Sequence, residues 1–277
     1  MGERQQTESS QHVEAIAAEA FEVLGTGRQV APFASRHRGF DLDDAYAVAA
    51  RVKEMRATRG ETAIGRKIGF TNADVQRFYG VAAPIWNYMF DRTVRDVGRR
   101  GELDLSGLSE PLIEPEIALH LAAAPEPAMD DVELLACVDW VAHGCEIVQS
   151  IFPGWKFEAA DSVAGYGLHG AYLVGERRPV AGDRAGWAEA LSSFTIEISS
   201  DAGVVRHGRA ANVLGGPLKA LRHLVRELSL SSPREPLRPG ELVTTGTLTD
   251  AMPVAAGQTW TTRLSGIDLP GIEVRFR

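Results

Sequence analysis

Apolar positions recur at helical spacing in the first sixty residues of the chain. One apolar stripe ends at Gly25, and a second begins after Asp41 and ends before Gly60. Spacings of three and four residues are typical of an amphipathic helix, and glycine commonly follows its last turn. The pattern therefore predicts two helices in this part of the chain. Their apolar faces are formed by Val13, Ile16, Ala17, Ala20, Phe21 and Leu24, and by Ala45, Val48, Ala49, Val52 and Met55.

From residue 61 onward the pattern changes to short apolar runs separated by glycine and proline. The run "TWTTRL" alternates polar and apolar positions, which is typical of a strand. Two helices are predicted between the strands, at about 130–143, opened by Asp130 and Asp131, and at about 217–229, with Pro217 in its first turn. The predicted strands lie near residues 113–122, 145–149, 170–175, 194–200, 242–246, 259–264 and 272–276.

The order of these elements shows no regular βαβ alternation and no internal repeat. It predicts an α+β fold, in which a helical amino-terminal portion packs on a mostly β core. We expect a disordered stretch at residues 1–10, the helical portion at 11–60 and a β-rich catalytic core at 61–277. The polar stretch "SSPREPLRPG", residues 231–240, predicts a loop.

Composition and net charge argue against several kinds of partner and location for this protein. The chain has 277 residues, 44% of them hydrophobic, and its 29 Lys and Arg against 37 Asp and Glu give a net charge of −8. Negative charge argues against nucleic acid or an anionic membrane as the main partner. The sequence contains neither an apolar run long enough to span a bilayer nor a signal-peptide core. Cys137 and Cys145 match no metal or redox spacing, which predicts reduced thiols in a cytoplasmic protein.

Two glutamates interrupt the apolar segment "LIEPEIALHL". Glu114 and Glu116 are two residues apart, so on a strand they point to the same face. Paired carboxylates on a buried face repel each other unless one is protonated or a cation lies between them, and Mg²⁺ or Mn²⁺ prefers such ligands. Glu146 in "CEIVQS" is a candidate third ligand, and Pro115 predicts an edge strand or a bulge. The plain alternative is a strand with one solvated face.

The run "GYGLHG", residues 165–170, has the G-x-G-x-x-G spacing of a dinucleotide-binding loop. That function requires a buried strand before the glycines and a helix after them. Here "FEAADSVA" precedes the run and the strand-like "AYLVGERRP" follows it. The context therefore argues against a dinucleotide.

A lysine and two histidines are further candidates for chemistry. Lys67 lies in the apolar, glycine-rich "IGRKIGFT", where burial would destabilise its charge and make it a proton donor or acceptor; the alternative is a lysine whose ammonium reaches water. His169 lies in the glycine-rich loop, and His120 lies on the strand of the paired glutamates. Either histidine is more often structural than catalytic. The sequence contains no G-x-S-x-G nucleophile motif.

Seven stretches, in this order, resemble the 2-keto-4-pentenoate hydratases and 4-oxalocrotonate decarboxylases of the fumarylacetoacetate hydrolase superfamily. The likeness runs from about residue 40 to the carboxyl terminus. The stretches are "LDDAYAVAARV", "GRKIGFT", "IEPEIAL", "CEIVQSIFPGWKFEAADSVA", "GAYLVG", "ANVLGGPLKAL" and "LRPGELVTTGTLTDAMPVAAGQT".

The resemblance implies a Mg²⁺- or Mn²⁺-dependent enzyme that acts on a short 2-oxo or 2-hydroxydienoic acid. It also implies a rolled, mixed β-sheet core and a homo-oligomer. The metal ligands of the family fall on Glu114, Glu116 and Glu146, and its active-site lysine falls on Lys67.

One loop departs from the family pattern. Typical members carry an Asp-Asn-Ala-Ser-like stretch that lines the pocket, where this chain has Gly165, Tyr166, Gly167, Leu168 and His169. We expect hydration of a 2-hydroxy-2,4-dienoate to a 4-hydroxy-2-oxo acid, with Lys67 moving the proton and His169 or Tyr166 orienting the water.

The sequence also fits alternative reactions and offers further candidate residues. The alternatives are decarboxylation of a 4-oxalocrotonate-type diacid, C–C hydrolysis of an acylpyruvate with His120 or His169 as base, and a non-catalytic partner subunit. Thr245 and Thr247 in "TTGTL" are candidates for binding the substrate carboxylate. Lys156 and Asp161 match family positions, and Asn212 with "LGGP" is expected to shape a helix entrance.

Overall fold

The computed structural model describes residues 2–230 and 235–277, with side chains from residue 11 onward in these ranges. The helices are α1 (Gly2–Val23), α2 (Leu42–Thr58), α3 (Ala73–Tyr79), α4 (Asp131–Ala136), α5 (Ala159–Ala164), α6 (Arg184–Ser193) and α7 (Pro217–Leu230). The first strands are β1 (Ala63–Gly69), β2 (Ile85–Phe90), β3 (Val94–Asp96), β4 (Arg100–Leu103), β5 (Leu112–Leu121), β6 (Val138–Val148) and β7 (His169–Val174). The others are β8 (Arg178–Pro179), β9 (Thr195–Ser200), β10 (Val205–Arg209), β11 (Leu242–Thr244), β12 (Met252–Pro253), β13 (Thr259–Ser265) and β14 (Glu273–Phe276).

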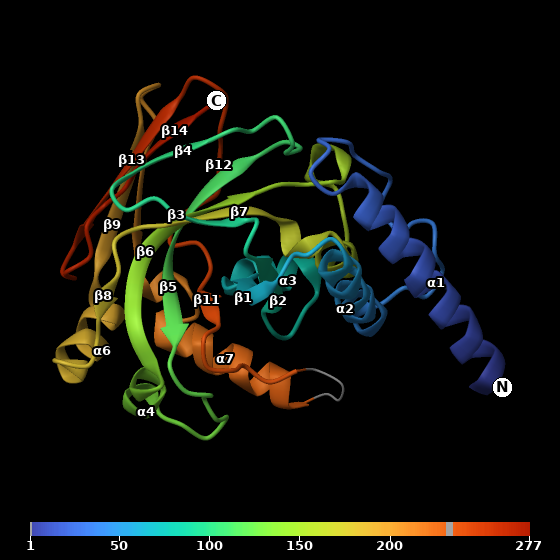
Figure 1. Cartoon of the computed structure of the whole chain (residues 1–277), viewed down its shortest axis with the longest axis horizontal. Helices are drawn as coiled ribbons and strands as arrows, with labels where there is room; N and C mark the ends of the chain where they lie inside the picture. Colours follow the sequence, from blue (N-terminus) through green and yellow to red (C-terminus); the bar gives the residue numbers. More distant parts are fainter. Residues whose placement is uncertain (1, 231–234) are drawn as a thin grey trace.

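The strands of the described residues form two sheets. The larger sheet has the order β2-β1-β11-β5-β6-β7-β3, with β12 paired to β5 and β8 paired to β6, and the smaller sheet has the order β10-β9-β13-β14-β4. Both sheets mix parallel and antiparallel pairs. The predicted α+β fold with a rolled, mixed sheet core is therefore confirmed (Figure 1).

The two sheets pack against each other through one face of β5, β6 and β7. Ile113, Ile147 and Leu173 on this face contact Trp260 and Phe276 of the smaller sheet in a buried apolar core. Helices α4, α6 and α7 extend the core beside the carboxyl end of β5, while α1 and α2 lie at the opposite end of the molecule with α5 (Figure 1). The helical face predicted from Ile16 and its neighbours is buried in that second core.

A buried histidine joins the two sheets behind the strand of the paired glutamates. Burial lowers the pKa of His143 to about 4, so its imidazole is neutral. His143 donates through Nδ1 to the Glu116 carbonyl at 2.9 Å and accepts through Nε2 from the Thr262 hydroxyl at 2.8 Å. The backbone of Glu116 is thus fixed from the side opposite its carboxylate.

Pro115 lies in an interior strand, so the predicted edge strand or bulge at this position is wrong. β5 lies between β6 on one side and β11 and β12 on the other. The carbonyl of Pro115 accepts from Leu248 N at 2.9 Å, in the gap between the β11 and β12 pairings. The N and O of one strand residue point to the same side, so the missing N–H of the proline lies where no ladder bond is required.

The helix predicted at 130–143 is much shorter in the structure. Asp130 caps α4 through a capping box with Glu133, and the helix ends at Ala136. β6 begins at Val138 and pairs with β5 in register. Because both faces of β6 are buried, its apolar run lacks strict alternation, which is why sequence periodicity did not separate strand from helix.

Two segments, residues 1–10 and residues 231–240, were expected to lack helices and strands. α1 begins at Gly2, inside the stretch 1–10 for which composition predicted disorder, and Met1 lies outside the described residues. In the predicted loop 231–240, residues 231–234 lie outside the described part and residues 235–240 contain no helix or strand.

Cys137 and Cys145 are buried, free thiols. No helix in the described ranges combines the length and hydropathy needed to cross a bilayer.

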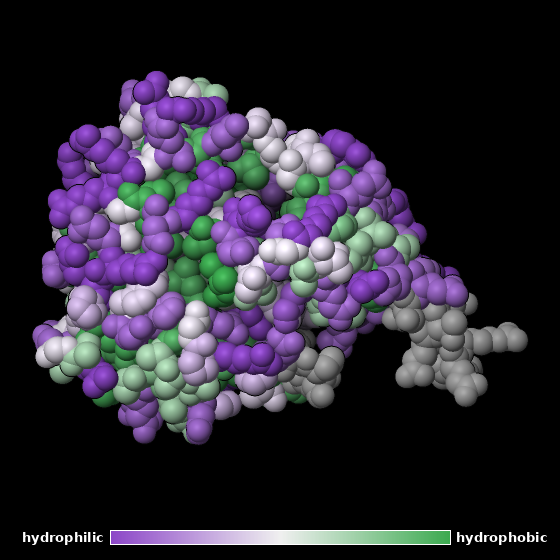
Figure 2. Space-filling model, in the orientation of Figure 1, coloured by the Kyte–Doolittle hydropathy of each residue, from purple (hydrophilic) through white to green (hydrophobic). Residues whose placement is uncertain are grey.

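The surface in this view carries mostly hydrophilic residues, with hydrophobic residues gathered in patches between them (Figure 2). The four large hydrophobic side chains that are well exposed in the described part are Phe78, Val132, Val205 and Leu230.

The close approach of β1 to β11 provides a test of the fold. A Cβ at Gly65 would lie 1.9 Å from the Leu242 carbonyl oxygen, whereas a Cβ at Gly182 would meet nothing within 4 Å. Gly65→Ala should therefore force β1 away from β11 and lower the free energy of unfolding by about 1–3 kcal/mol. Chemical denaturation measures the change, with Gly182→Ala as the matched control. Equal stability of the two variants would contradict this packing.

Candidate metal centre and active site

Polar side chains line one face of the larger sheet. Cross-strand partners project to the same face, and the register of six neighbouring strands aligns a row of such partners. Asn87 is opposite Lys67, Lys67 is opposite Thr244, Thr244 is opposite Ala118, Glu114 is opposite Glu146, and Glu146 is opposite Tyr172. Glu116 belongs to the same face because it alternates with Glu114 and Ala118 along β5. The register of the strands, and not proximity in the sequence, thus brings these side chains together.

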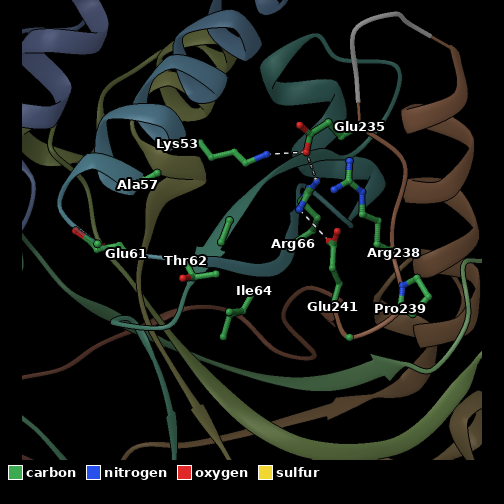
Figure 3. A pocket seen from close by; sticks show the side chains of 13 residues that line it. Lys53, Ala57, Glu61, Thr62, Ile64, Arg66, Glu235, Arg238, Pro239 and Glu241 are labelled. Atoms are coloured by element: carbon green, nitrogen blue, oxygen red, sulfur yellow. Dashed lines mark hydrogen bonds and ion pairs between the residues drawn. The ribbon is translucent and has the colours of Figure 1, made fainter.

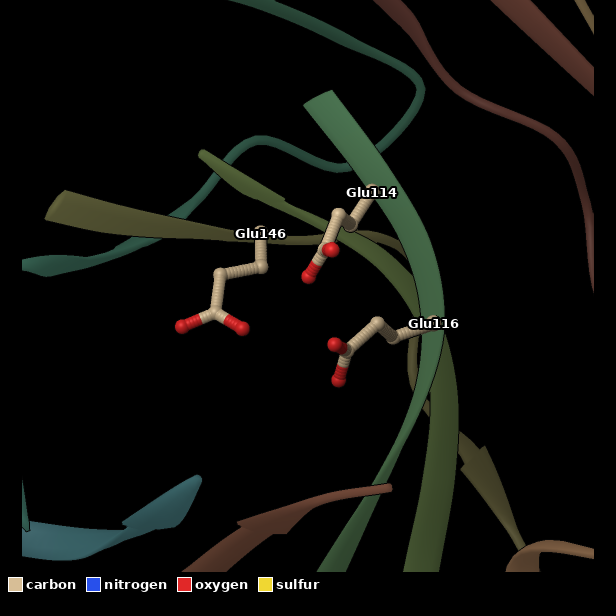
Figure 4. A group of neighbouring side chains, drawn as sticks. All are labelled: Glu114, Glu116 and Glu146. Carbon is tan, nitrogen blue, oxygen red and sulfur yellow. The ribbon is translucent and has the colours of Figure 1, made fainter. Parts of the chain in front are cut away.

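Glu114, Glu116 and Glu146 converge at the centre of this face. One carboxylate oxygen from each lies within 4.8 Å of the others, and the three side chains point toward one another (Figure 4). Glu116 and Glu146 are fully buried, and Glu114 is partly buried. The convergence predicted from the sequence is therefore present in the structure.

Crowding and burial disturb the charges of the three glutamates. Burial and the Glu146 charge together raise the pKa of Glu114 to about 7 and the pKa of Glu116 well above its usual value, although Lys67 acts in the opposite direction on both. Burial acts in the same direction on Glu146, but Lys67 and His169 outweigh it and hold the pKa of Glu146 below its usual value. The site therefore contains one stable carboxylate and two whose ionisation requires more positive charge.

Lys67 supplies part of that charge. Its Nζ lies 3.3 Å from Glu146 Oε2 and donates to the Gly167 carbonyl at 2.9 Å, and only 3% of the residue is exposed. Burial lowers the pKa of Lys67, but Glu146, Glu114 and Glu116 together raise it above the usual value. Burial therefore destabilises the charge of Lys67 as expected, but the three glutamates overcome that effect and favour the ammonium form.

His169 holds Glu146 in place. Burial lowers the pKa of His169, so the ring is neutral. It donates through Nδ1 to Glu146 Oε1 at 2.7 Å, and its Nε2 lies 2.9 Å from the Thr93 hydroxyl oxygen. Both ring nitrogens are engaged, which makes His169 a positioning residue and leaves no nitrogen to orient a water molecule.

The donor set fits a hard divalent cation. Two carboxylate oxygens of the cluster, Glu116 Oε1 and Glu146 Oε2, are buried without a hydrogen-bond partner. Buried polar atoms are almost always paired, and three carboxylates around one point are the oxygen ligands that Mg²⁺ or Mn²⁺ prefers. The residues present therefore match the metal that the sequence predicted.

The loop before β7 has an unusual backbone. Tyr166, Gly167 and Leu168 form a single turn in which all three φ angles are positive, at 65°, 62° and 64°. This conformation is costly for residues with a Cβ, so surrounding contacts must maintain it. The turn presents the Gly167 carbonyl to Lys67. α5 precedes the loop and β7 follows it, which is the reverse of the strand-then-helix order of a dinucleotide-binding loop.

A cavity of about 240 Å³ opens beside Lys67 and Glu114. Half-buried aromatic rings form one wall: Tyr79 stacks on Phe70 at 4.6 Å and on Phe157 at 5.4 Å between ring centroids, and Trp155 lies 6.2 Å from Phe157. Thr247, a candidate for binding the substrate carboxylate, lines the cavity. The lining residues are Lys67, Ile68, Gly69, Phe70, Thr71, Asn72, Val75, Tyr79, Ile85, Leu112, Glu114, Val148, Trp155, Phe157, Gly167, Leu168, Gly246, Thr247 and Ala251.

Four of the predicted site residues belong neither to the lining of this cavity nor to the glutamate cluster with its His169 contact. Tyr166 is buried against α1, where its hydroxyl donates to the Ala20 carbonyl. Thr245 is buried and donates to the Ile117 carbonyl at 3.1 Å. Asp161 accepts from Ala34 N and Glu158 N at 2.9 Å each, and Lys156 is exposed. Tyr166, Thr245 and Asp161 thus make local structural contacts in this chain.

His120 and Asn212 also serve structural contacts. His120 lies 2.7 Å from Asp139 and stacks on Trp140 near the far end of β5. Asn212 donates to the Leu248 carbonyl at 2.8 Å, just before the start of α7. Neither residue lines the cavity beside Lys67.

Other residues of the site were missed by the sequence analysis. Thr93 holds His169, Gly246 N donates to Glu116 Oε2 at 3.0 Å, and Asn87 donates to the Val163 carbonyl at 2.7 Å behind the loop. A polar residue inside the apolar run "IWNYMF" was a usable signal for Asn87. Thr244, rather than Thr245, faces Lys67, and only the register decides between the two.

A second cavity lies on the opposite side of β1. It measures about 640 Å³, and its wall carries ion pairs of Arg66 with Glu241 at 2.9 Å and of Lys53 with Glu235 at 2.6 Å (Figure 3). Arg66 and Lys67 are consecutive on a strand, so they point to opposite faces. The charges in this cavity compensate one another, and it is separate from the glutamate cluster.

Comparison with known proteins identifies relatives over nearly the whole chain. The chain is 30% identical over 260 residues to 2-keto-4-pentenoate hydratase of Paraburkholderia xenovorans, which covers 93% of each protein. It is 28% identical over 266 residues to 2-hydroxyhexa-2,4-dienoate hydratase of Comamonas testosteroni, covering 95% of this chain and 97% of the relative. No protein-family model matches the chain.

Solved structures with the same fold include metal-bound enzymes. 4-Oxalocrotonate decarboxylase from Pseudomonas putida G7, complexed with magnesium and adipate, superposes with a TM-score of 0.87 at 25% identity, covering 97% of this chain and 98% of that one. Fumarylpyruvate hydrolase from Pseudomonas aeruginosa, in complex with Mn²⁺ and pyruvate, shares the fold with a TM-score of 0.57 at 16% identity, covering 76% and 88%.

The raised pKa of Glu114 predicts opposite effects of pH on the metal-free and metal-loaded protein. Its folded pKa of about 7 exceeds the value near 4.3 of an unfolded chain, so its contribution to stability is lost as pH rises through 7. A cation binds the ionised carboxylates and competes with protons. The increase in melting temperature that excess Mg²⁺ produces over a chelator should therefore be larger at about pH 8 than at about pH 5.5. An equal increase at both pH values would contradict the charge assignment.

The left-handed turn before β7 provides a second test. A Cβ at Gly167 would lie 2.8 Å from Asn87 Cβ and 3.2 Å from Lys67 Cδ, while Gly154 has a similar φ of 65° and open space around it. Gly154→Ala should cost about 1–2 kcal/mol of stability from backbone strain alone. Gly167→Ala should cost roughly 1–3 kcal/mol more because the added methyl group meets both side chains. Chemical denaturation of the two variants measures the difference, and equal losses would show that the contact has no effect.

Proposed function

Because this chain belongs to the 2-keto-4-pentenoate hydratase family, we propose that it adds water to a 2-hydroxy-2,4-dienoate that carries a single carboxylate. The product is a 4-hydroxy-2-oxo acid, and the reaction depends on a divalent cation. The observation that carries the proposal is the cavity that joins Glu114 and Lys67 to an apolar, aromatic wall. Glu114 and Lys67 are the charged residues of the cavity wall, and most of the other lining residues are apolar or aromatic.

Glu114, Glu116 and Glu146 would hold Mg²⁺ or Mn²⁺, and the bound cation would polarise the carboxylate and the 2-oxygen of the substrate as a Lewis acid. His169 and Gly246 N fix two of these carboxylates before the substrate arrives. The choice between the two metals is part of the proposal.

Lys67 would move the proton during tautomerisation. The 2-hydroxy-2,4-dienoate loses the proton of its 2-hydroxyl group and gains one at C5, which gives the 2-oxo-3-enoate. Water then adds across this enone, with the hydroxyl group at C4 and a hydrogen at C3. The Lys67 ammonium donates to the Gly167 carbonyl and lies at the cavity wall. It would be within reach of a substrate acid bound to a cation that the three glutamates hold.

The cavity wall favours a substrate with one carboxylate over a diacid. Among the described residues that line it, Lys67 is the sole cation, and its charge is already engaged by Glu146. A second carboxylate at the far end would meet Tyr79, Phe157 and Trp155 instead of a basic side chain, and burying it unpaired is costly. This observation argues against a 4-oxalocrotonate-type decarboxylase, although a decarboxylase shares the fold.

The remaining alternatives have less support. Acylpyruvate hydrolysis requires a base for the water, and neither His169 nor His120 is placed for that role, as described above. A non-catalytic subunit would not require the converging carboxylates or the buried Lys67. A homo-oligomeric state and a cytoplasmic location stay predictions from the sequence.

The reaction can be followed directly. Protein purified with Mg²⁺ or Mn²⁺ should convert 2-hydroxypenta-2,4-dienoate with loss of its ultraviolet absorbance and should turn over the corresponding dienedioic acid more slowly. Faster loss of carbon dioxide from the diacid would assign decarboxylation instead. Turnover of an acylpyruvate in place of either acid would assign hydrolysis.

Substitution of the lysine tests its role. Lys67→Met should lower kcat by about 10²- to 10⁴-fold, the range for a lost proton-transfer group. Binding of Mg²⁺ by the variant, measured calorimetrically, should persist because the three glutamates remain. Lys156→Met is the matched control, since Lys156 is exposed outside the cavity and its loss should leave kcat unchanged. Normal turnover by Lys67→Met would remove this residue from the mechanism.

A further inference from the structure

Tyr172 carries a hydroxyl group that is buried without a partner. The residue is fully buried, and its hydroxyl oxygen has no hydrogen bond. The other buried side-chain oxygens without a hydrogen bond, among the described residues, are Glu116 Oε1, Thr244 Oγ1 and Glu146 Oε2, and all three belong to the same face of the sheet. Of these, Glu146 Oε2 forms an ion pair with Lys67 at 3.3 Å. An unpaired buried hydroxyl destabilises a fold, and a phenylalanine would fill the same space. The clustering of these atoms indicates a shared function.

The backbone of β6 provides the space that Tyr172 occupies. Tyr172 is opposite Glu146, and its ring lies against Gly144, two residues along β6. A Cβ at Gly144 would lie 2.5 Å from the tyrosine oxygen and 2.6 Å from two ring carbons. Gly144 is in turn opposite Glu116 on β5. The absence of a side chain at Gly144 therefore lets the hydroxyl extend across β6 toward Glu116.

Glu116 has one anchored oxygen and one open oxygen. Oε2 accepts from Gly246 N at 3.0 Å, while Oε1 is buried and unpaired. Glu146 differs, because His169 and Lys67 hold its two oxygens. Glu116 thus lacks the second contact that would fix the orientation of its carboxylate.

We propose that Tyr172 is a positioning residue for the metal centre, whose hydroxyl donates a hydrogen bond to Glu116 when a divalent cation is bound. The inference rests on the metal dependence proposed above and deepens it. Partners that orient metal ligands are a regular part of metal sites, and their loss typically weakens metal binding about 10- to 100-fold. The hydroxyl has no other hydrogen-bond partner among the described residues, so without this bond it lowers the stability of the fold.

Tyr172→Phe separates the two states of the site. In the presence of a chelator, the variant should melt at the same temperature as the wild type or higher, because the unpaired hydroxyl is gone. Its dissociation constant for Mg²⁺ or Mn²⁺, measured by isothermal titration calorimetry, should rise about 10- to 100-fold. The stabilisation by excess cation should fall accordingly.

Tyr166→Phe is the matched control. Tyr166 is also buried, but its hydroxyl donates to the Ala20 carbonyl away from the metal centre. This variant should melt at a lower temperature than the wild type with chelator present and should bind the cation with unchanged affinity. The two tyrosines therefore predict opposite patterns in the two measurements.

Two results would overturn the inference in different ways. Unchanged cation affinity of Tyr172→Phe, with normal binding by the wild type, would reject the role of Tyr172 and leave the proposed function intact. Failure of the wild type to bind either cation would reject the metal dependence itself and the role of Tyr172 with it.

Discussion

The repulsion among three buried carboxylates is the constraint on which this structure depends. Glu114, Glu116 and Glu146 have oxygens within 4.8 Å of one another in an apolar environment. Lys67 offsets only part of their charge, and the pKa of two of the three remains raised. Such a cluster destabilises the fold by itself, so its presence indicates a cation that turns the repulsion into binding. The neighbouring residues fix the three carboxylates in positions where they can bind a cation.

The sheet meets this constraint through rigid support from behind and from both sides. His143 fixes the backbone of Glu116 from the core between the sheets, His169 fixes Glu146 through Thr93, and Gly246 fixes one oxygen of Glu116. The turn at residues 166–168 has an unfavourable backbone and brings the Gly167 carbonyl to Lys67. Strain of this kind is found where local geometry serves a function. Here it holds an ammonium group at the edge of the cavity.

The cavity wall has a charged part and an aromatic part. Glu114 and Lys67 form its charged part, while the aromatic wall of Phe70, Tyr79, Phe157 and Trp155 offers no second positive charge. Enzymes of this fold carry out decarboxylation and hydrolysis as well as hydration, so the fold alone does not assign the reaction. In this chain, the polarity of the far wall favours hydration of an acid with one carboxylate.

The sequence by itself determined the two helices of the amino-terminal portion, seven of the fourteen described strands, and the site candidates Glu114, Glu116, Glu146 and Lys67. These features depend on local periodicity and on residues whose chemistry stands out from an apolar segment. The tertiary structure alone decided which hydroxyl groups and imidazoles reach the site. Thr244 rather than Thr245 faces Lys67, Tyr166 turns toward α1, His169 turns toward Glu146, and Tyr172 reaches across Gly144. The physical reason is that adjacent strand residues point to opposite faces, so strand register and turn conformation, which depend on distant residues, select the side chains that meet.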